Sequence, residues 1–313
     1  MIKDIARCSL GHFPTPLHTL PDHDALWVKR DDLAGFVWAG NKTRSLEFLM
    51  AEALGKGASC VVGGGVSTSN FIAALAVAAS RLGLRCHLLV PAPVEATTSI
   101  RLARLVGAVV EEVPFSRDEL DEAIGRRAAE LDAQGHVAHP IARGGATATG
   151  ALGFTAAAAE LKEQLLAQGW SITDPCTVVI PVGSGASIAG LLAGTSLTET
   201  PFRVVGISVS RPPADVEWGI TRLAGEVLAR LGANPSRLAS CDVEVIDRRR
   251  APGPEDARQA AASLARQGLL VDDHYGLPTW LAAQGIVKEQ HPVVVWQTGG
   301  LAGVPQLLAE VGQ

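Results

Sequence analysis

The 313-residue sequence contains few cysteines, and none of them are spaced as metal ligands usually are. No two of the five form a C-x-x-C pair, and their number is odd. Zinc sites and disulfide frameworks need closely spaced or paired cysteines. We therefore expect no metal centre and no disulfide framework. A reducing compartment such as the cytoplasm fits this usage. The five are Cys8, Cys60, Cys86, Cys176 and Cys241.

Positive charge and long apolar runs are also missing. The net charge is −5, and the only basic cluster is 248–250, so no basic stripe is present that could neutralise phosphates. The most apolar helical segment, 71–79, is too short to cross a bilayer and is followed by Arg81. The N-terminus has no secretory apolar segment. We expect a soluble cytoplasmic protein that binds neither nucleic acid nor membrane.

What the sequence does contain is a regular alternation of short apolar runs and amphipathic segments, which predicts parallel sheets with helices on their faces. The pattern breaks near 139–145, where we place a domain crossing. The expected strands are 26–30, 58–62, 85–90, 108–113, 177–181, 202–209 and 293–296. The expected helices are 42–54, 71–82, 97–106, 117–133, 147–168, one directly after 182–187, 215–231, 255–267 and one at the C-terminus.

A lysine stands at the start of the first long helix, in Gly40-Asn41-Lys42-Thr43-Arg44. Asn41 suits the N-cap position, so Lys42 falls in the first turn. The helix dipole and burial both disfavour a protonated amine there. Because pyridoxal phosphate (PLP) chemistry needs a neutral amine, we interpret Lys42 as a candidate Schiff-base lysine. Its spacing alone also fits an exposed first-turn lysine.

Two glycine-rich loops, 63–70 and 182–187, each follow an expected strand and lead into a helix. The second loop offers free backbone N–H groups and two hydroxyls, which suit a phosphate, although a tight turn would look the same. Neither loop completes G-x-G-x-x-G, because the sixth positions are Thr68 and Ile188. Asn41 likewise interrupts a P-loop between Gly40 and Lys42. These mismatches argue against NAD and ATP.

The motifs stand in one order along the chain: 30–32, 41–44, 69–70, 143–145, 183–187 and 298–300. In this order the chain resembles the D-cysteine desulfhydrase / 1-aminocyclopropane-1-carboxylate (ACC) deaminase family of fold type II PLP enzymes, from Phe13 to Leu308. The resemblance implies an α/β fold of two domains, each an open, mostly parallel sheet with helices on both faces and PLP in the cleft between them. It implies a large domain of 1–44 and 155–313, a small domain of 45–154, and a homodimer.

The resemblance also implies a role for each matching residue. Lys42 would bond PLP, Asn70 would bind its ring hydroxyl, and Ser69 would meet the substrate. Tyr275 would line the substrate pocket, and Thr298 would approach the pyridine nitrogen. The remaining cofactor-binding candidates are Asn41 beside the lysine and the phosphate cup Gly183, Ser184, Gly185, Ala186 and Ser187. Without the resemblance, each of three residues also has a purely structural explanation. Ser69 could cap a helix, Tyr275 could pack at the edge of the core, and Thr298 could end a strand.

Two positions depart from the family pattern. Phe71 follows Asn70 where the family often has His, and Gly276 follows Tyr275 where the family has Glu or Thr reaching the pyridine nitrogen. Thr298 then remains as a neutral partner of that nitrogen. A neutral partner gives a weaker electron sink, which favours rapid loss of a good leaving group. We interpret Asp272 and Asp273 as loop caps rather than as a catalytic carboxylate pair.

The activity that follows is that of a PLP-dependent lyase or deaminase. Such an enzyme would remove the α-proton of a small amino acid, eliminate its β-substituent, and release ammonia and a 2-oxo acid. One alternative is a β-replacement synthase, in which a nucleophile takes the place of the leaving group. Another is a non-catalytic PLP-fold binding protein. The substrate, its chirality and the leaving group stay open.

Overall fold

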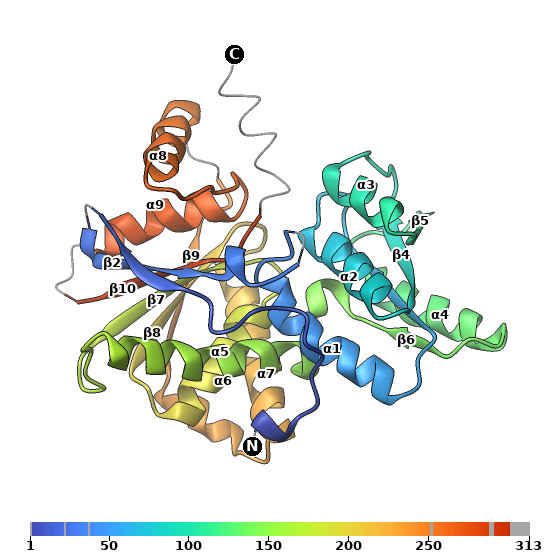
Figure 1. Ribbon diagram of the computed structural model, residues 1–313, viewed down its shortest axis with the longest axis horizontal. Coiled ribbons are helices and arrows are strands. Elements are labelled where there is room, and N and C mark those ends of the chain that lie inside the picture. Colours follow the sequence, from blue (N-terminus) through green and yellow to red (C-terminus); the bar gives the residue numbers. More distant parts are fainter. Residues whose placement is uncertain (1, 22, 37, 251–252, 288–290, 301–313) are drawn as a thin grey trace.

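The computed structural model describes residues 2–21, 23–36, 38–250, 253–287 and 291–300. The described chain forms two lobes, each built around its own sheet (Figure 1). No helix within these ranges is long and apolar enough to cross a membrane. The predicted fold class, an α/β protein with two mostly parallel sheets, is confirmed.

The larger sheet has six strands in the order β1-β2-β10-β7-β8-β9. Its strands are β1 (Leu17–Leu20), β2 (His23–Arg30), β7 (Cys176–Val182), β8 (Phe202–Ser208), β9 (Asp242–Asp247) and β10 (Val293–Gln297). β1 runs antiparallel to β2, and the other neighbours are parallel. The carboxyl ends of five strands therefore meet along one edge.

The smaller sheet has four strands in the order β5-β4-β3-β6, all of them parallel. These are β3 (Cys60–Gly64), β4 (Arg85–Pro91), β5 (Val109–Val113) and β6 (Ala138–Pro140). All four lie inside the predicted small domain, and the strands of the larger sheet lie outside it. The domain division at 44/45 and 154/155 stays a prediction.

Helices cover both faces of each sheet. Around the larger sheet, α5, α6 and α7 lie on one side and α8 and α9 on the other (Figure 1). The helices are α1 (Lys42–Gly55), α2 (Asn70–Arg81), α3 (Thr98–Leu105), α4 (Leu120–Ala133), α5 (Ala148–Ala167), α6 (Ala186–Thr198), α7 (Pro213–Arg230), α8 (Pro254–Arg266) and α9 (Gly276–Ile286).

Residue alternation along the central strands explains this layering. On β7, Val178 and Ile180 are buried in the same cluster as residues of α5, α6 and α7, whereas Val179 belongs to the cluster that includes α9. On β3, Val61 packs in the α2 cluster and Val62 in the α4 cluster. Because successive side chains point to opposite faces, a continuous apolar run indicates a strand covered on both sides.

The sequence pattern missed four elements. β1 and β6 are short, with four and three residues, and β9 alternates acidic and apolar residues at the edge of its sheet. α9 contains two glycines and Pro278, which weaken a helical pattern. Its burial in the core supplies the stability that its propensity does not. The expected C-terminal helix lies outside the described residues.

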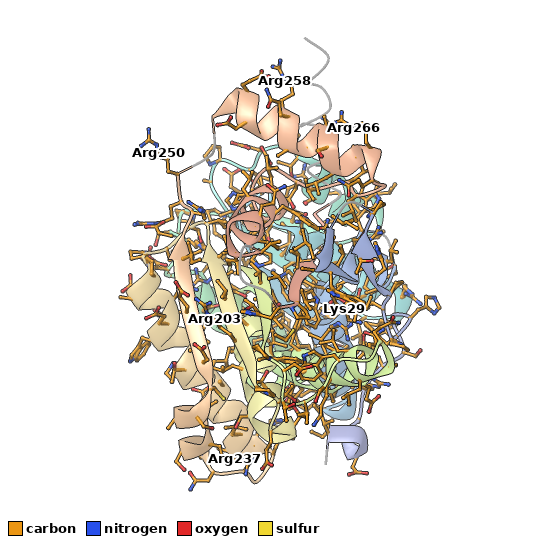
Figure 2. The ribbon with its side chains drawn as sticks, turned by 90° about the vertical axis from the view of Figure 1, so that its left-hand side faces the viewer. Lys29, Arg203, Arg237, Arg250, Arg258 and Arg266 are labelled. Carbon is orange, nitrogen blue, oxygen red and sulfur yellow. The ribbon has the colours of Figure 1, made fainter. Side chains whose placement is uncertain are left out.

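A buried group of charges ties α1 to the larger sheet and to α5. Arg44 donates to Asp31 at 2.7 and 2.8 Å and to Glu160 at 2.9 and 3.0 Å. Lys29, which has no exposed surface, donates to Glu160 and to Gln164. Figure 2 shows Lys29 among the ribbon layers, while the exposed Arg258 lies at the periphery. The cluster orders the chain two residues after Lys42.

The same cluster predicts a defined loss of stability in acid. Its arginine and lysine hold the pKa of Glu160, ordinarily 4.5, at about 2 despite burial. A depressed carboxyl pKa stabilises the fold above about pH 4.5, and this stabilisation disappears as the pH falls toward 2. We expect Glu160→Gln to cost about 3–5 kcal/mol at neutral pH, because Arg44 and Lys29 lose their shared anion.

Urea unfolding from pH 7 to pH 2 measures this effect. The variant and the native protein should differ most above pH 5 and least near pH 2. Glu163→Gln removes the same charge from an exposed position on α5 and should leave the free energy of unfolding nearly unchanged. Equal effects of the two substitutions would show that the buried pairing contributes nothing.

Candidate active site

A cavity of about 660 Å³ lies at the carboxyl ends of strands from both sheets. Its wall is built from the segments that follow eight parallel strands, where open α/β sheets place their ligands. The segments from the larger sheet include 39–42, 183–188, Ser210 and 298–300. Those from the smaller sheet include 64–71, 96–101, Arg117 and 143–144. The loop before α9 completes the wall with 272–275.

Lys42 is the first residue of α1 and lies in the cavity wall. Burial lowers the pKa of its amine from 10.5 to about 8. No other described residue forms a hydrogen bond or ion pair with this amine. The lysine is therefore held at a cavity surface, with a larger neutral fraction at neutral pH than an ordinary lysine has. Asn41 occupies the predicted N-cap position, but its side chain makes no capping hydrogen bond. It donates instead to Ser187 Oγ at 3.1 Å.

Gly40, just before α1, allows the chain to pack closely against Thr298 at the end of β10. Its φ is +54°, and a Cβ added there would lie 2.2 Å from the carbonyl oxygen of Thr298. The same oxygen accepts the backbone N–H of Asn41 at 2.9 Å. Only glycine combines a left-handed backbone with this contact. Thr298 itself is half-buried and lines the cavity.

The second glycine loop joins β7 to α6 and faces the cavity. Gly185 has φ +99° and stands at the N-cap of α6, so the first N–H groups of a 13-residue helix open toward the loop. Gly183, Ser184, Gly185 and Ser187 line the cavity, whereas the side chain of Ala186 packs into the core. The positive end of a helix and two hydroxyls make this loop a suitable anion site.

Ser69 and Asn70 approach from the smaller sheet. Ser69 caps α2, accepting the N–H of Phe71 at 3.3 Å, and it also lines the cavity. Asn70 begins α2 and lines the cavity beside it. Phe71 is buried in the core of the smaller lobe and also forms part of the cavity wall. The capping role and a ligand-binding role of Ser69 are therefore compatible.

Tyr275 lies across from these residues, between the cavity and the core around α9. A Cβ added at Gly183 would be 3.0 Å from its hydroxyl oxygen, so the ring packs against the phosphate-cup loop. Burial raises the pKa of the Tyr275 hydroxyl, which stays protonated at neutral pH. The structure thus brings Lys42, Ser69, Asn70, Tyr275 and Thr298 to one cavity.

Sequence reasoning assigned no role to several arginines around the same loop, although Arg143 belongs to the motif 143–145. Arg211 donates through Nη2 to the carbonyl oxygens of Gly183 and Ser184, at 3.0 and 3.4 Å. Arg117 and Arg143 line the cavity, and their charges lower the pKa of Arg211 after the larger effect of burial. Each follows the carboxyl end of a strand, which is the signal that could have identified them.

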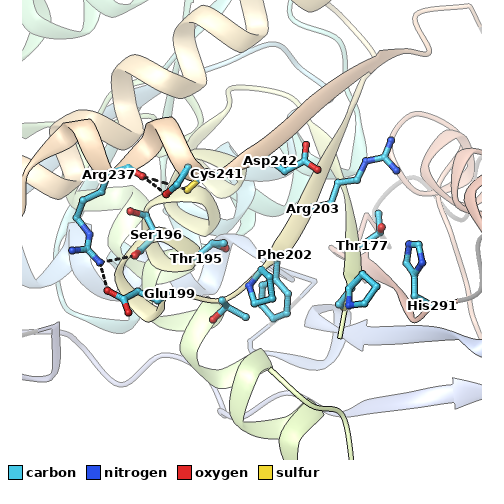
Figure 3. A pocket seen from close by; sticks show the side chains of 15 residues that line it. Thr177, Thr195, Ser196, Glu199, Phe202, Arg203, Arg237, Cys241, Asp242 and His291 are labelled. Carbon is cyan, nitrogen blue, oxygen red and sulfur yellow. Dashed lines mark hydrogen bonds and ion pairs between the residues drawn. The ribbon is translucent and has the colours of Figure 1, made fainter. Parts of the chain in front are cut away.

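A second hollow lies at the opposite, amino-terminal ends of β7, β8 and β9 (Figure 3). Its wall includes Thr195, Ser196 and the Arg237–Glu199 ion pair at 2.9 Å. None of the residues predicted for catalysis or cofactor binding lies in it. Its position at the strand starts also differs from the usual ligand edge of parallel sheets.

The residues of the first cavity fit a phosphorylated aldehyde bound to a lysine. The Lys42 amine, whose pKa is lowered, and a glycine loop with free backbone N–H groups lie in the same wall. The cavity is large enough for a small cofactor. Cβ atoms at Gly144 and Gly183 would approach Ser184 Oγ and Tyr275 Oη to 2.6 and 3.0 Å, so these glycines keep the cup open. The fold and the site together define an enzyme class that holds such a cofactor.

Comparison with known proteins supports this enzyme class. A family model for pyridoxal-phosphate dependent enzymes matches residues 8–299. A D-cysteine desulfhydrase from Salmonella paratyphi A is 30% identical over 319 aligned positions, covering 94% of each chain. The solved structure of an ACC deaminase homologue superposes with a TM-score of 0.87 at 26% identity, covering 99% of this chain and 97% of that one.

A diaminopropionate ammonia lyase from Escherichia coli shares the fold, with a TM-score of 0.67 at 16% identity over 96% of this chain and 88% of that one. This chain belongs to the family of pyridoxal-phosphate dependent enzymes. The predicted resemblance and the predicted cofactor are both confirmed. The roles of the individual site residues stay predictions.

Gly40 offers a sharp test of the site geometry. We expect Gly40→Ala to lose about 1–2 kcal/mol of stability from its left-handed backbone and to weaken PLP binding at least about tenfold through the clash with Thr298. Gly83→Ala is the matched control, because Gly83 has φ +72° with nothing within 4 Å of an added Cβ. It should lose stability but keep its affinity for PLP. Thermal unfolding and absorbance titration with PLP separate the two effects, and equal PLP affinities of both variants would refute the account.

Proposed function

We propose that this enzyme is a PLP-dependent lyase that removes the α-proton and the β-substituent of a small amino acid, releasing ammonia and a 2-oxo acid. The observation that carries the proposal is Lys42, whose amine has a lowered pKa and no hydrogen-bond or ion-pair partner among the described residues. It lies in the wall of a cavity that a glycine loop also lines. The identity of 30% to a D-cysteine desulfhydrase supports elimination as the reaction. We also propose a cytoplasmic location and a homodimer.

Lys42 is the proposed base. With a pKa of about 8 in place of 10.5, its Nζ is neutral far more often at neutral pH than that of an ordinary lysine, and the neutral amine can accept the proton from the substrate α-carbon. Bound PLP supplies an electron-withdrawing ring that stabilises the electron pair left on that carbon. The pair then forms a double bond to the β-carbon, and the leaving group departs with the electrons of its own bond. The β-carbon of the product then takes up a proton, and water replaces the amino nitrogen, which leaves as ammonia.

Ser69 and Asn70 are proposed to orient the bound molecules. Ser69 Oγ accepts a backbone N–H, so its hydroxyl hydrogen remains to be donated to a substrate carboxylate in the cavity. Asn70 is proposed to bind the cofactor ring hydroxyl. The phosphate cup and Asn41, which donates to Ser187 Oγ, are proposed to hold the other end of the cofactor.

Tyr275 is proposed to act at the leaving group. Because burial keeps its hydroxyl protonated, the residue can donate a proton or a hydrogen bond as the β-substituent departs. Its contact with the loop at Gly183 holds the ring in the cavity wall. Tyr275→Phe should therefore slow elimination of poor leaving groups more than that of good ones.

The proposal is tested by supplying D-cysteine, O-acetylserine, β-chloroalanine and ACC separately and assaying ammonia and 2-oxo acid. We expect at least one of the first three compounds, each of which carries an α-proton and a β-leaving group, to give both products in equal amounts. Lys42→Ala should lower this rate by about a thousandfold or more, since it removes the base and the covalent anchor. Turnover of ACC alone, which has no α-proton, would contradict elimination through α-proton removal. Repeating the assay with added thiols or amines distinguishes elimination from replacement. A new amino acid formed only with the nucleophile, and no 2-oxo acid without it, would contradict the lyase proposal.

A further inference from the structure

Asp272 is a buried carboxylate in the cavity wall that the proposed reaction does not use. It is 3% exposed and lies in the loop between α8 and α9. Its Oδ1 accepts the backbone N–H groups of His274 and Tyr275, at 3.1 and 2.6 Å, and its Oδ2 accepts that of Gly276 at 3.1 Å. These bonds cap the start of α9, as a loop-capping role for Asp272 requires.

Two glycines pack closely against Oδ2, a contact that a capping role alone does not require. A Cβ added at Gly300 would lie only 2.1 Å from this oxygen, and one added at Gly276 would lie 3.2 Å from it. The Gly276 Cβ would also come within 2.9 Å of Val271 Cβ. Any larger residue at either position would shield or displace the carboxylate. Asp272 and Gly300 both line the cavity, so this close packing lies in its wall.

The charge of Asp272 is also incompletely compensated. No lysine, arginine or histidine in the described part of the chain forms an ion pair with it, although Lys29, Arg44 and Arg143 pair with other carboxylates. Burial raises the pKa of Asp272, and the backbone bonds to Tyr275 and Gly276 oppose this rise. The charge of the exposed His274 makes a smaller opposing contribution, and that of Asp273 adds to the rise. Buried carboxylates are ordinarily matched by a cation or by a full set of donors. A cationic N–H donor in the cavity would complete the set.

The pyridine nitrogen of PLP is such a donor when it is protonated. In PLP this nitrogen is para to the ring carbon that carries the aldehyde group, and the aldehyde carbon is the one that would bond the lysine. A partner of the nitrogen would therefore come from a part of the wall other than α1. Asp272 meets this condition, because it comes from the loop before α9. Asp273, the neighbouring carboxylate in the wall, is exposed and has water to solvate it.

We propose that Asp272 is the carboxylate partner of the pyridine nitrogen and replaces the side chain that is missing at Gly276. This inference rests on the proposed function, since it places the cofactor in the same cavity. It reverses the expectation drawn from Gly276 and Thr298 alone. A carboxylate keeps the ring nitrogen protonated and the ring a strong electron sink, which extends the reaction to poorer leaving groups than a neutral partner would allow.

The test compares binding of PLP and of its 1-deaza analogue, in which C–H replaces the pyridine nitrogen, to the apoenzyme. The native enzyme should bind PLP about tenfold or more tightly than the analogue, because only PLP forms the charge-assisted hydrogen bond. Asp272→Asn keeps an oxygen for capping but removes the charge, and it should lose this preference. Asp273→Asn makes the same charge change at an exposed position and should retain it.

Each outcome has a defined meaning. An unchanged preference in Asp272→Asn, or no preference in the native enzyme, would overturn the assignment. Loss of the preference in Thr298→Val alone would assign the nitrogen to a hydroxyl instead and would equally overturn it. Uptake of neither compound by the native apoenzyme would contradict the proposed function, whereas uptake of both with equal affinity would contradict only the role of Asp272.

A second measurement needs no variant and covers the case in which Asp272→Asn fails to fold. The 15N chemical shift of ring-labelled PLP distinguishes a protonated from a neutral pyridine nitrogen in the native holoenzyme. We expect the shift of the protonated form at neutral pH. The shift of the neutral form would overturn the proposal without reference to activity or to any substitution.

Discussion

The pairing of Arg44 with Asp31 and Glu160 is the interaction on which the site depends. One guanidinium binds two carboxylates from β2's end and from α5, so the first turn of α1 is fixed to the larger sheet. The backbones of α1 and α5 also touch closely, because a Cβ at Gly153 would lie 2.2 Å from the Arg44 carbonyl oxygen. Removing one member of such a buried network destabilises the fold strongly, because the remaining charge is left buried without a partner. It positions Lys42, two residues earlier, without occupying the cavity.

Two sheets then supply complementary parts of one site. The larger sheet carries the lysine, the phosphate-cup loop and Thr298, and the smaller one carries Ser69 and Asn70. Each part lies at a strand's carboxyl end, where the chain leaves the sheet and backbone N–H groups are free. The contact of Gly40 with Thr298 joins two segments far apart in sequence into a continuous wall. The chemistry therefore depends on backbone contacts at glycines as much as on the functional side chains.

Much of this arrangement could be predicted from the sequence, because it depends on local patterns. Apolar runs such as 177–181 and the glycines that follow them predicted the buried strands and the loops at their ends. The order of motifs predicted which residues would meet. The features of the site that depend on tertiary contacts could not be predicted from the sequence. Arg211 reaches the phosphate-cup loop only because β8 lies beside β7, and Asp272 enters the wall only because Gly276 and Gly300 leave room for it. α9 forms through burial against its helical propensity.

The central claim is that Lys42 is the residue that carries the cofactor, and chemical trapping tests it directly. Borohydride reduction of the holoenzyme fixes the lysine–cofactor bond, and mass spectrometry of proteolytic peptides locates the added group. The account predicts one modified peptide, containing Lys42 at the start of α1. Attachment at another lysine, such as the buried Lys29 or the exposed Lys56, or no attachment at all, would contradict it.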